Sequence, residues 1–175
     1  MTDKKLMSIL NTLANSDIFF GPQGFKNVTS AVELNNAQLG FGMSELGQAI
    51  ANNDTAPEEK GSWQTTWQVI ARDTELGDPY FVDIGQPTLP VYTGFLGDEG
   101  WEVEQVATTL AGYIECMALL FSHGQQSQAQ FVPDETSVID EDLLQPLQEQ
   151  LIEISGCKHF WQMFMQCYLD WLMED

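Results

Sequence analysis

Three aspartates in one short stretch, RDTELGDPYFVDIG at residues 72–85, are the first candidates for chemistry. Asp73 and Asp78 flank a turn, where two carboxyl groups could act as general acid and base or bind Ca²⁺. The spacing lacks the repeated oxygen ligands of an EF-hand loop. Turn formation explains the same residues, because glycine tolerates positive φ and aspartate accepts bonds from backbone N–H groups. We therefore predict a structural turn motif with Asp78 as the capping residue and Asp73 and Asp83 at strand ends: Asp73, Gly77, Asp78, Pro79 and Asp83.

Other motifs that carry chemistry are missing from the sequence. It contains no GxSxG, HExxH, Walker or CxxC pattern. The glycine-rich run GFLGDEG at 94–100 could resemble a phosphate cradle, but Asp98 and Glu99 lie inside it and no lysine follows. We therefore expect it to be a turn between a strand and the next helix. Cys157 and His159 stand at i and i+2, which point in different directions on a helix. We expect no catalytic residue, no cofactor and no metal.

The chain is strongly acidic, with 26 Asp and Glu against 6 Lys and Arg and a formal net charge of −20. Between Asp73 and Cys157 there are 16 acids and no Lys or Arg. Such a field repels phosphate groups and anionic lipids, so nucleic acid and membrane surfaces are poor partners. It would steer a basic protein toward the chain, at a rate that falls as salt rises. Acidity that serves only solubility is the alternative interpretation.

The length of 175 residues suits one domain, or one domain with a helical extension. A single domain of this size would bury roughly 70% of its unfolded surface. Three cysteines without CxxC spacing make no disulfide framework and fit a reducing compartment. The N-terminus imitates a signal peptide, with two lysines before an apolar run, but polar residues interrupt that run at helical spacing. No other stretch approaches the ~20 apolar residues of a membrane span. We expect a cytoplasmic protein.

The N-terminal part of the chain favours helices. A first helix runs from about Thr2 to Ala14, capped by Thr2, and its apolar face consists of Leu6, Ile9, Leu10 and Leu13. Residues 28–52 favour two short helical pieces around two glycines, with Ser44 as a candidate N-cap, and a polar loop follows at 52–62.

In the middle of the chain, the sequence pattern changes from that of helices to that of strands. Three strand-length runs at 63–73, 79–85 and 89–95 predict an antiparallel meander. The run at 101–124 predicts one long helix, with Glu102 and Glu104 at its N-terminus and His123 and Gly124 at its end. Its apolar stripe should lie in the core: Val103, Val106, Ala107, Leu110, Tyr113, Ile114, Met117, Leu120 and Phe121.

The C-terminal part, about 141–174, predicts a helical hairpin. Its first helix, 142–155, should stop at Gly156 and start near Gln145 or bend there, because Pro146 cannot lie deep inside a helix. The second helix, from Cys157 onward, is apolar nearly all round. It should be buried on more than one face, in the core or against a partner.

The order of these motifs resembles the SUKH superfamily, the Smi/Knr-type proteins. The similarity rests on IARD and GDPYFVD in the hairpin, on LPVYTGF, and on the following VATTLAGYI. It covers residues 63–121, and the FW of KHFWQMF is similar to an ending of some members. The family's LG-x-x-LP segment is not recognisable between residues 30 and 60.

The resemblance implies a single α+β domain over residues 1–175, with a mixed, mostly antiparallel sheet and with N-terminal helices and a C-terminal helical hairpin packed around it. It also implies no enzyme. Many bacterial members resemble immunity proteins that bind and neutralise a toxin, often a nuclease, and fungal relatives are regulatory binding proteins.

Three functional hypotheses follow. The first is an immunity-type module that binds a basic toxin stoichiometrically through exposed acidic loops, with these candidate residues: Asp98, Glu99, Asp140, Glu141 and Asp142. The second is a cytoplasmic regulator or scaffold that binds through its apolar C-terminal helix. The third is an enzyme that uses Asp73, Asp78 or His159.

Overall fold

The computed structural model describes residues 1–13, 17–44, 46–49, 61–126 and 141–174, with only the backbone for 124–126 and 141–143. The described elements are α1 (Asp3–Leu10), β1 (Asp17–Phe19), β2 (Gly24–Asn27), α2 (Ala31–Ala37), β3 (Trp67–Asp73), β4 (Pro79–Asp83), β5 (Val91–Gly97), β6 (Gly100–Ala107), α3 (Leu110–Gln126), α4 (Glu141–Ser155) and α5 (Lys158–Leu172). The six strands form one sheet in chain order, each antiparallel to its neighbour. The expected α+β fold is confirmed.

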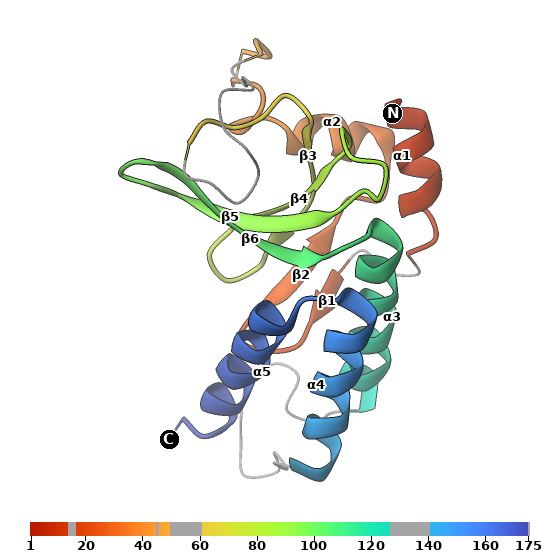
Figure 1. The fold of residues 1–175 in the computed structure, drawn as a ribbon, viewed down its shortest axis with the longest axis vertical. Coiled ribbons are helices and arrows are strands. Elements are labelled where there is room, and N and C mark those ends of the chain that lie inside the picture. The colour runs from red at the N-terminus through yellow and green to blue at the C-terminus, as the bar shows by residue number, and fades with distance from the viewer. Residues whose placement is uncertain (14–16, 45, 50–60, 127–140, 175) are drawn as a thin grey trace.

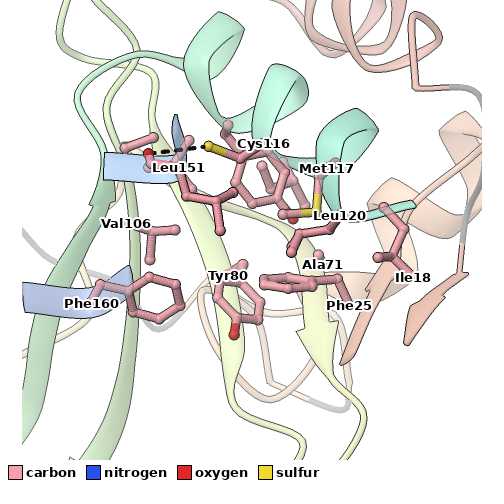
Figure 2. Packing of buried hydrophobic residues seen from close by; sticks show 14 of the residues in the cluster. Ile18, Phe25, Ala71, Tyr80, Val106, Cys116, Met117, Leu120, Leu151 and Phe160 are labelled. Carbon is pink, nitrogen blue, oxygen red and sulfur yellow. Dashed lines mark hydrogen bonds between the residues drawn. The ribbon is translucent and has the colours of Figure 1, made fainter. Parts of the chain in front are cut away.

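One face of the sheet carries the main core, which α3, α4 and α5 cover below the hairpin of β5 and β6 (Figure 1). The rings of Phe25 and Tyr80, from β2 and β4, lie beside side chains of α3 (Figure 2) and contact the Tyr113 ring. Cys116 of α3 faces α4, with its Sγ 3.7 Å from the Leu151 carbonyl oxygen. Burial raises the pKa of the Cys116 thiol to about 12, so this cysteine is a core residue and not a nucleophile.

The other face of the sheet carries a smaller aromatic cluster, and no long helix of the described residues covers it. Its buried members are Trp63, Trp67, Val69, Phe81 and Tyr92. Phe41, Trp101 and Val103 pack against them as partly buried residues. The Arg72 guanidinium lies 4.7 Å from the centre of the Phe41 ring, a cation–π contact at the margin of this cluster.

The N-terminal helices are shorter than predicted. Thr2 caps α1 by accepting a hydrogen bond from the Lys5 N–H, as expected, but the helix ends at Leu10 rather than at Ala14. In the next segment only one helix forms among the described residues, and its N-cap is Ser30. Ser44, the predicted N-cap, instead accepts a bond from the Gln48 N–H within a turn.

The predicted meander at β3, β4 and β5 is confirmed, but the predicted long helix is wrong at its start. Residues 100–107 form β6, and α3 begins at Leu110 after Thr109, whose hydroxyl accepts a bond from the Gly112 N–H. The WEVE run at 101–104 alternates apolar and polar side chains with the period of a strand. Its pairing with β5, from Gly97 opposite Gly100 onward, decides between the two periods. Gly124 also lies inside α3 and does not end it.

The predicted C-terminal hairpin is confirmed, with a difference at its start. α4 begins at Glu141 and contains Pro146, so the predicted start near Gln145 is wrong. Gly156, with φ of 73°, ends α4 as expected. α5 buries one broad side in the core through Phe160, Trp161, Phe164, Met165, Tyr168 and Leu172. Among the described residues, no helix combines the length and apolar character that crossing a membrane requires.

Candidate binding site

The hairpin of β5 and β6 projects beyond the helices that cover the rest of the sheet (Figure 1). A two-residue turn, Asp98 and Glu99, joins the two strands between Gly97 and Gly100. Gly100 has φ of 118°, and a Cβ there would stand 2.6 Å from the Gly61 carbonyl oxygen. Trp101 exchanges two backbone hydrogen bonds with Gly61, at 2.7 and 3.3 Å, which hold this part of the hairpin. The glycine-rich run is thus a hairpin turn, not a connection to a helix.

The end of this hairpin combines exposed apolar and acidic side chains. Phe95 is 52% exposed and Leu96 is 68% exposed, whereas large apolar side chains usually lie inside. The side chains of Asp98 and Glu99 are exposed beside them. We call these four residues the hairpin tip. The sequence analysis found the two acids but missed Phe95 and Leu96. It did not predict β6, the strand that pairs with β5 and forms the hairpin that exposes these two residues.

The other predicted partner-binding residues lie elsewhere. Asp140 is outside the described residues, and Glu141 and Asp142 open α4, where only the backbone is described. Figure 1 shows the start of α4 at the opposite end of the molecule from the hairpin tip. The structure therefore does not bring Glu141 and Asp142 together with Asp98 and Glu99 in one surface.

A second acidic feature lies on the helix-bearing face of the hairpin. A hollow of about 200 Å³ is lined by Asp78, Thr93, Gly94, Phe95, Glu102, Val103 and Glu104. Glu102 and Glu104 stand on the same side of β6, because alternate residues of a strand share a face. They lie opposite Phe95 and Thr93 of β5. We call this feature the acidic hollow. The sequence analysis placed Glu102 and Glu104 at a helix N-terminus; the alternation of WEVE at 101–104 is the signal that could have placed them on one face of a strand.

Burial and neighbouring carboxylates shift the pKa values of two groups near the acidic hollow. Partial burial, and then the charge of Asp73, raise the pKa of the Asp78 carboxyl. Burial raises the pKa of Tyr80 well above its usual value, and the carboxylates of Asp73, Asp78 and Glu104 add to this. From α5, the His159 Nδ1 contacts the Glu104 Oε1 at a short distance. These contacts place carboxylates from two hairpins beside one end of α5.

In the turn motif at 73–83, Asp73 and Asp78 have other structural roles than those predicted. Asp73, not Asp78, caps the first turn, since its Oδ2 accepts a bond from the Leu76 N–H at 2.8 Å. Asp78 contributes its backbone carbonyl, which accepts from the Asp73 N–H at 2.8 Å. Asp83 ends β4 and caps the next turn, with its Oδ1 2.9 Å from the Gly85 nitrogen. Gly77 has φ of 78°, as the turn chemistry requires.

The remaining candidates for chemistry do not form a shared site in the described part of the chain. Cys157 is a buried N-cap residue of α5, and His159 is 79% exposed on the Glu104 side. Within the described residues, no three His, Cys, Asp or Glu side chains are arranged to hold a metal ion.

Comparison with protein-family models, with curated proteins and with solved structures finds no match to this chain.

Proposed function

We propose that this chain is a non-catalytic protein-binding module that neutralises a basic protein, most plainly a toxin, by stoichiometric binding through the β5–β6 hairpin. The observation that carries the proposal is the hairpin tip, where Phe95 and Leu96 are exposed beside Asp98 and Glu99 on a projecting hairpin. Exposed apolar side chains next to charges are typical of interaction sites. The resemblance to SUKH immunity proteins agrees with this function.

The net charge of −20 supports a basic partner. Association between opposite charges is steered by the whole field of the protein, and the gain in rate falls with salt. The apolar pair at the tip would supply contact area, while the acids would supply orientation. A basic nuclease would have its cationic active site covered by an acidic surface in place of its nucleic acid.

The test begins with capture of a partner from the native cell, followed by purification of both proteins. Titration calorimetry then compares the wild-type chain with Phe95→Ser/Leu96→Ser, which removes the exposed apolar pair and leaves the core untouched. We expect a 1:1 complex whose affinity drops at least about tenfold in the variant. Unchanged affinity would show that the partner binds elsewhere.

The alternative is a regulator that binds through the exposed side of the C-terminal helix. The aromatic side of α5 is buried, and Met163 and Met173 are its exposed large apolar residues among those described. Removal of residues 157–175 separates the two. We expect the shortened chain to unfold, as judged by circular dichroism, because six core side chains leave with α5. A folded remainder that has lost its partner would favour the regulator.

A further inference from the structure

We infer that the outer edge of β6, at Val103 and Gln105, binds an extended basic segment of the partner, which adds a strand to the six-stranded sheet. This inference rests on the proposed function and names how the hairpin would hold the partner. It concerns backbone groups of β6, whereas the hairpin tip contributes side chains.

The direction of the backbone groups in β6 follows from the pairing of this strand. Trp101 exchanges two hydrogen bonds with Gly61, so its N–H and C=O groups point away from β5. Because these directions alternate along an antiparallel strand, the groups of Val103 and Gln105 point to the same outer side. β6 is the last strand of the sheet. Among the hydrogen bonds of the described residues, none engages these outward groups.

The unpaired stretch of this edge lies between two positions that are already paired. On one side Gly61 forms an antiparallel bridge with Trp101. On the other side the Val106 carbonyl oxygen accepts the indole N–H of Trp161 at 3.1 Å. The half-buried residues between them present a row of backbone donors and acceptors. An extended peptide carries the complementary groups at the same spacing, which is the basis of recognition by strand addition.

Charge favours a basic segment over a second copy of this chain. Glu102 and Glu104 project from one face of β6, since alternate residues of a strand share a face. Two copies paired along this edge would bring these acids together, and like charges across neighbouring strands are destabilising. The net charge of −20 adds to the repulsion. Lysine or arginine at alternate positions would instead lie beside the acids, with apolar side chains beside Trp101 and Val103 on the face of the aromatic cluster.

The inference is tested by NMR titration of the full chain at fixed ionic strength. The probe is a hexapeptide of alternating lysine and valine with blocked ends. The control is the same peptide N-methylated at its valines, whose N–H groups would face β6. We expect saturable shifts of the backbone amides at 101–106 and slower hydrogen exchange at Val103 and Gln105. The methylated peptide should bind about tenfold more weakly or not at all, because it has lost its donors.

Three results would overturn the inference. Equal binding of the two peptides would show attraction by charge alone. Equal shifts at Asp17–Phe19, the opposite edge of the sheet, would show pairing with any edge. Slow exchange at Val103 and Gln105 before the peptide is added would show that this chain or a second copy already covers the edge, and its dependence on protein concentration separates these two cases.

A matched pair of variants extends the test to the captured partner. Val103→Pro removes the outward N–H and leaves the bonds to β5, a place in a sheet where proline is tolerated. Val103→Thr keeps the N–H and the β-branched shape. We expect only the proline variant, folded by circular dichroism, to lose at least about tenfold in affinity for the peptide and for the partner. Equal affinities of the two variants would contradict strand addition. If affinity for the partner still falls in Phe95→Ser/Leu96→Ser, the proposed function stands without it.

Discussion

Trp161 donates its indole N–H to the Val106 carbonyl oxygen across 3.1 Å, which fixes the last helix to the strand that carries the hairpin. Both residues are fully buried, and Trp161 also packs edge-on against Phe160 and Phe164. The bond spans 55 residues of sequence. Through this hydrogen bond, α5 helps to hold β6 in place.

This bond predicts the stability of a conservative variant. Trp161→Phe keeps an aromatic ring but leaves the buried Val106 carbonyl without its donor, so the free energy of unfolding should fall by at least about 1–3 kcal/mol. Denaturation in urea measures it. Trp171→Phe is the matched control, because Trp171 is only partly buried and packs at the margin of the core. Equal losses in the two variants would show that the hydrogen bond contributes nothing.

Asp78 should lower the free energy of unfolding by an amount that depends on pH. Its pKa is raised above the usual 3.8, so its ionised form is less favourable in the folded than in the unfolded chain. Asp78→Asn should therefore raise the free energy of unfolding at pH 7. The gain should shrink as the pH falls through the raised pKa and should vanish below about 3.8, where the carboxyl is protonated in both states.

Asp73, the neighbouring carboxylate, serves as the control, because its removal should change the free energy of unfolding in the opposite direction. Asp73→Ala removes the acceptor of the Leu76 N–H, so it should lower the free energy of unfolding at pH 7 by about 1 kcal/mol. Thermal denaturation over a series of pH values compares the two variants. A destabilised Asp78→Asn at pH 7 would mean that Asp78 makes a favourable contact that its burial conceals.

Replacing Gly112 by alanine should destabilise the chain, although alanine has the higher helix propensity. Glycine to alanine inside a helix usually stabilises by up to about 1 kcal/mol. At this position a Cβ would stand 2.9 Å from the Ile154 carbonyl oxygen, so α3 would have to move away from α4. We therefore expect Gly112→Ala to lower the melting temperature. A raised melting temperature would show that the two helices can separate at no cost.

The sequence allowed the α+β class, the meander of β3 to β5 and the helical hairpin to be predicted, because their patterns have one dominant period. It did not predict β6. The stripe from Val103 to Phe121 fits a helical period, and only pairing of Gly100–Ala107 with β5 makes the first part a strand. Pairing with the neighbouring strand β5 decided the structure there, and the short alternation of WEVE at 101–104 was outweighed in the prediction by the longer helical stripe.

The candidate site was predictable in part for the same reason. Asp98 and Glu99 follow from the turn between two glycines, which is local in sequence. The acidic hollow brings together Asp78, Glu102 and Glu104 from two hairpins, and it exists only through the register of β5 with β6. The exchange of capping roles between Asp73 and Asp78 also depends on where β3 ends, at a residue that the pattern alone fixes only approximately.

The most direct test of the account measures the affinity of the captured partner against salt concentration for two charge-reversed variants. Asp98→Lys/Glu99→Lys changes the hairpin tip, and Glu115→Lys/Glu153→Lys changes two exposed acids on α3 and α4 by the same net charge. We expect the tip variant to lose at least about tenfold in affinity at low salt and to show a weaker salt dependence, while the control changes little. Equal behaviour of the two variants, or an affinity indifferent to salt in the wild-type chain, would contradict binding by the acidic hairpin.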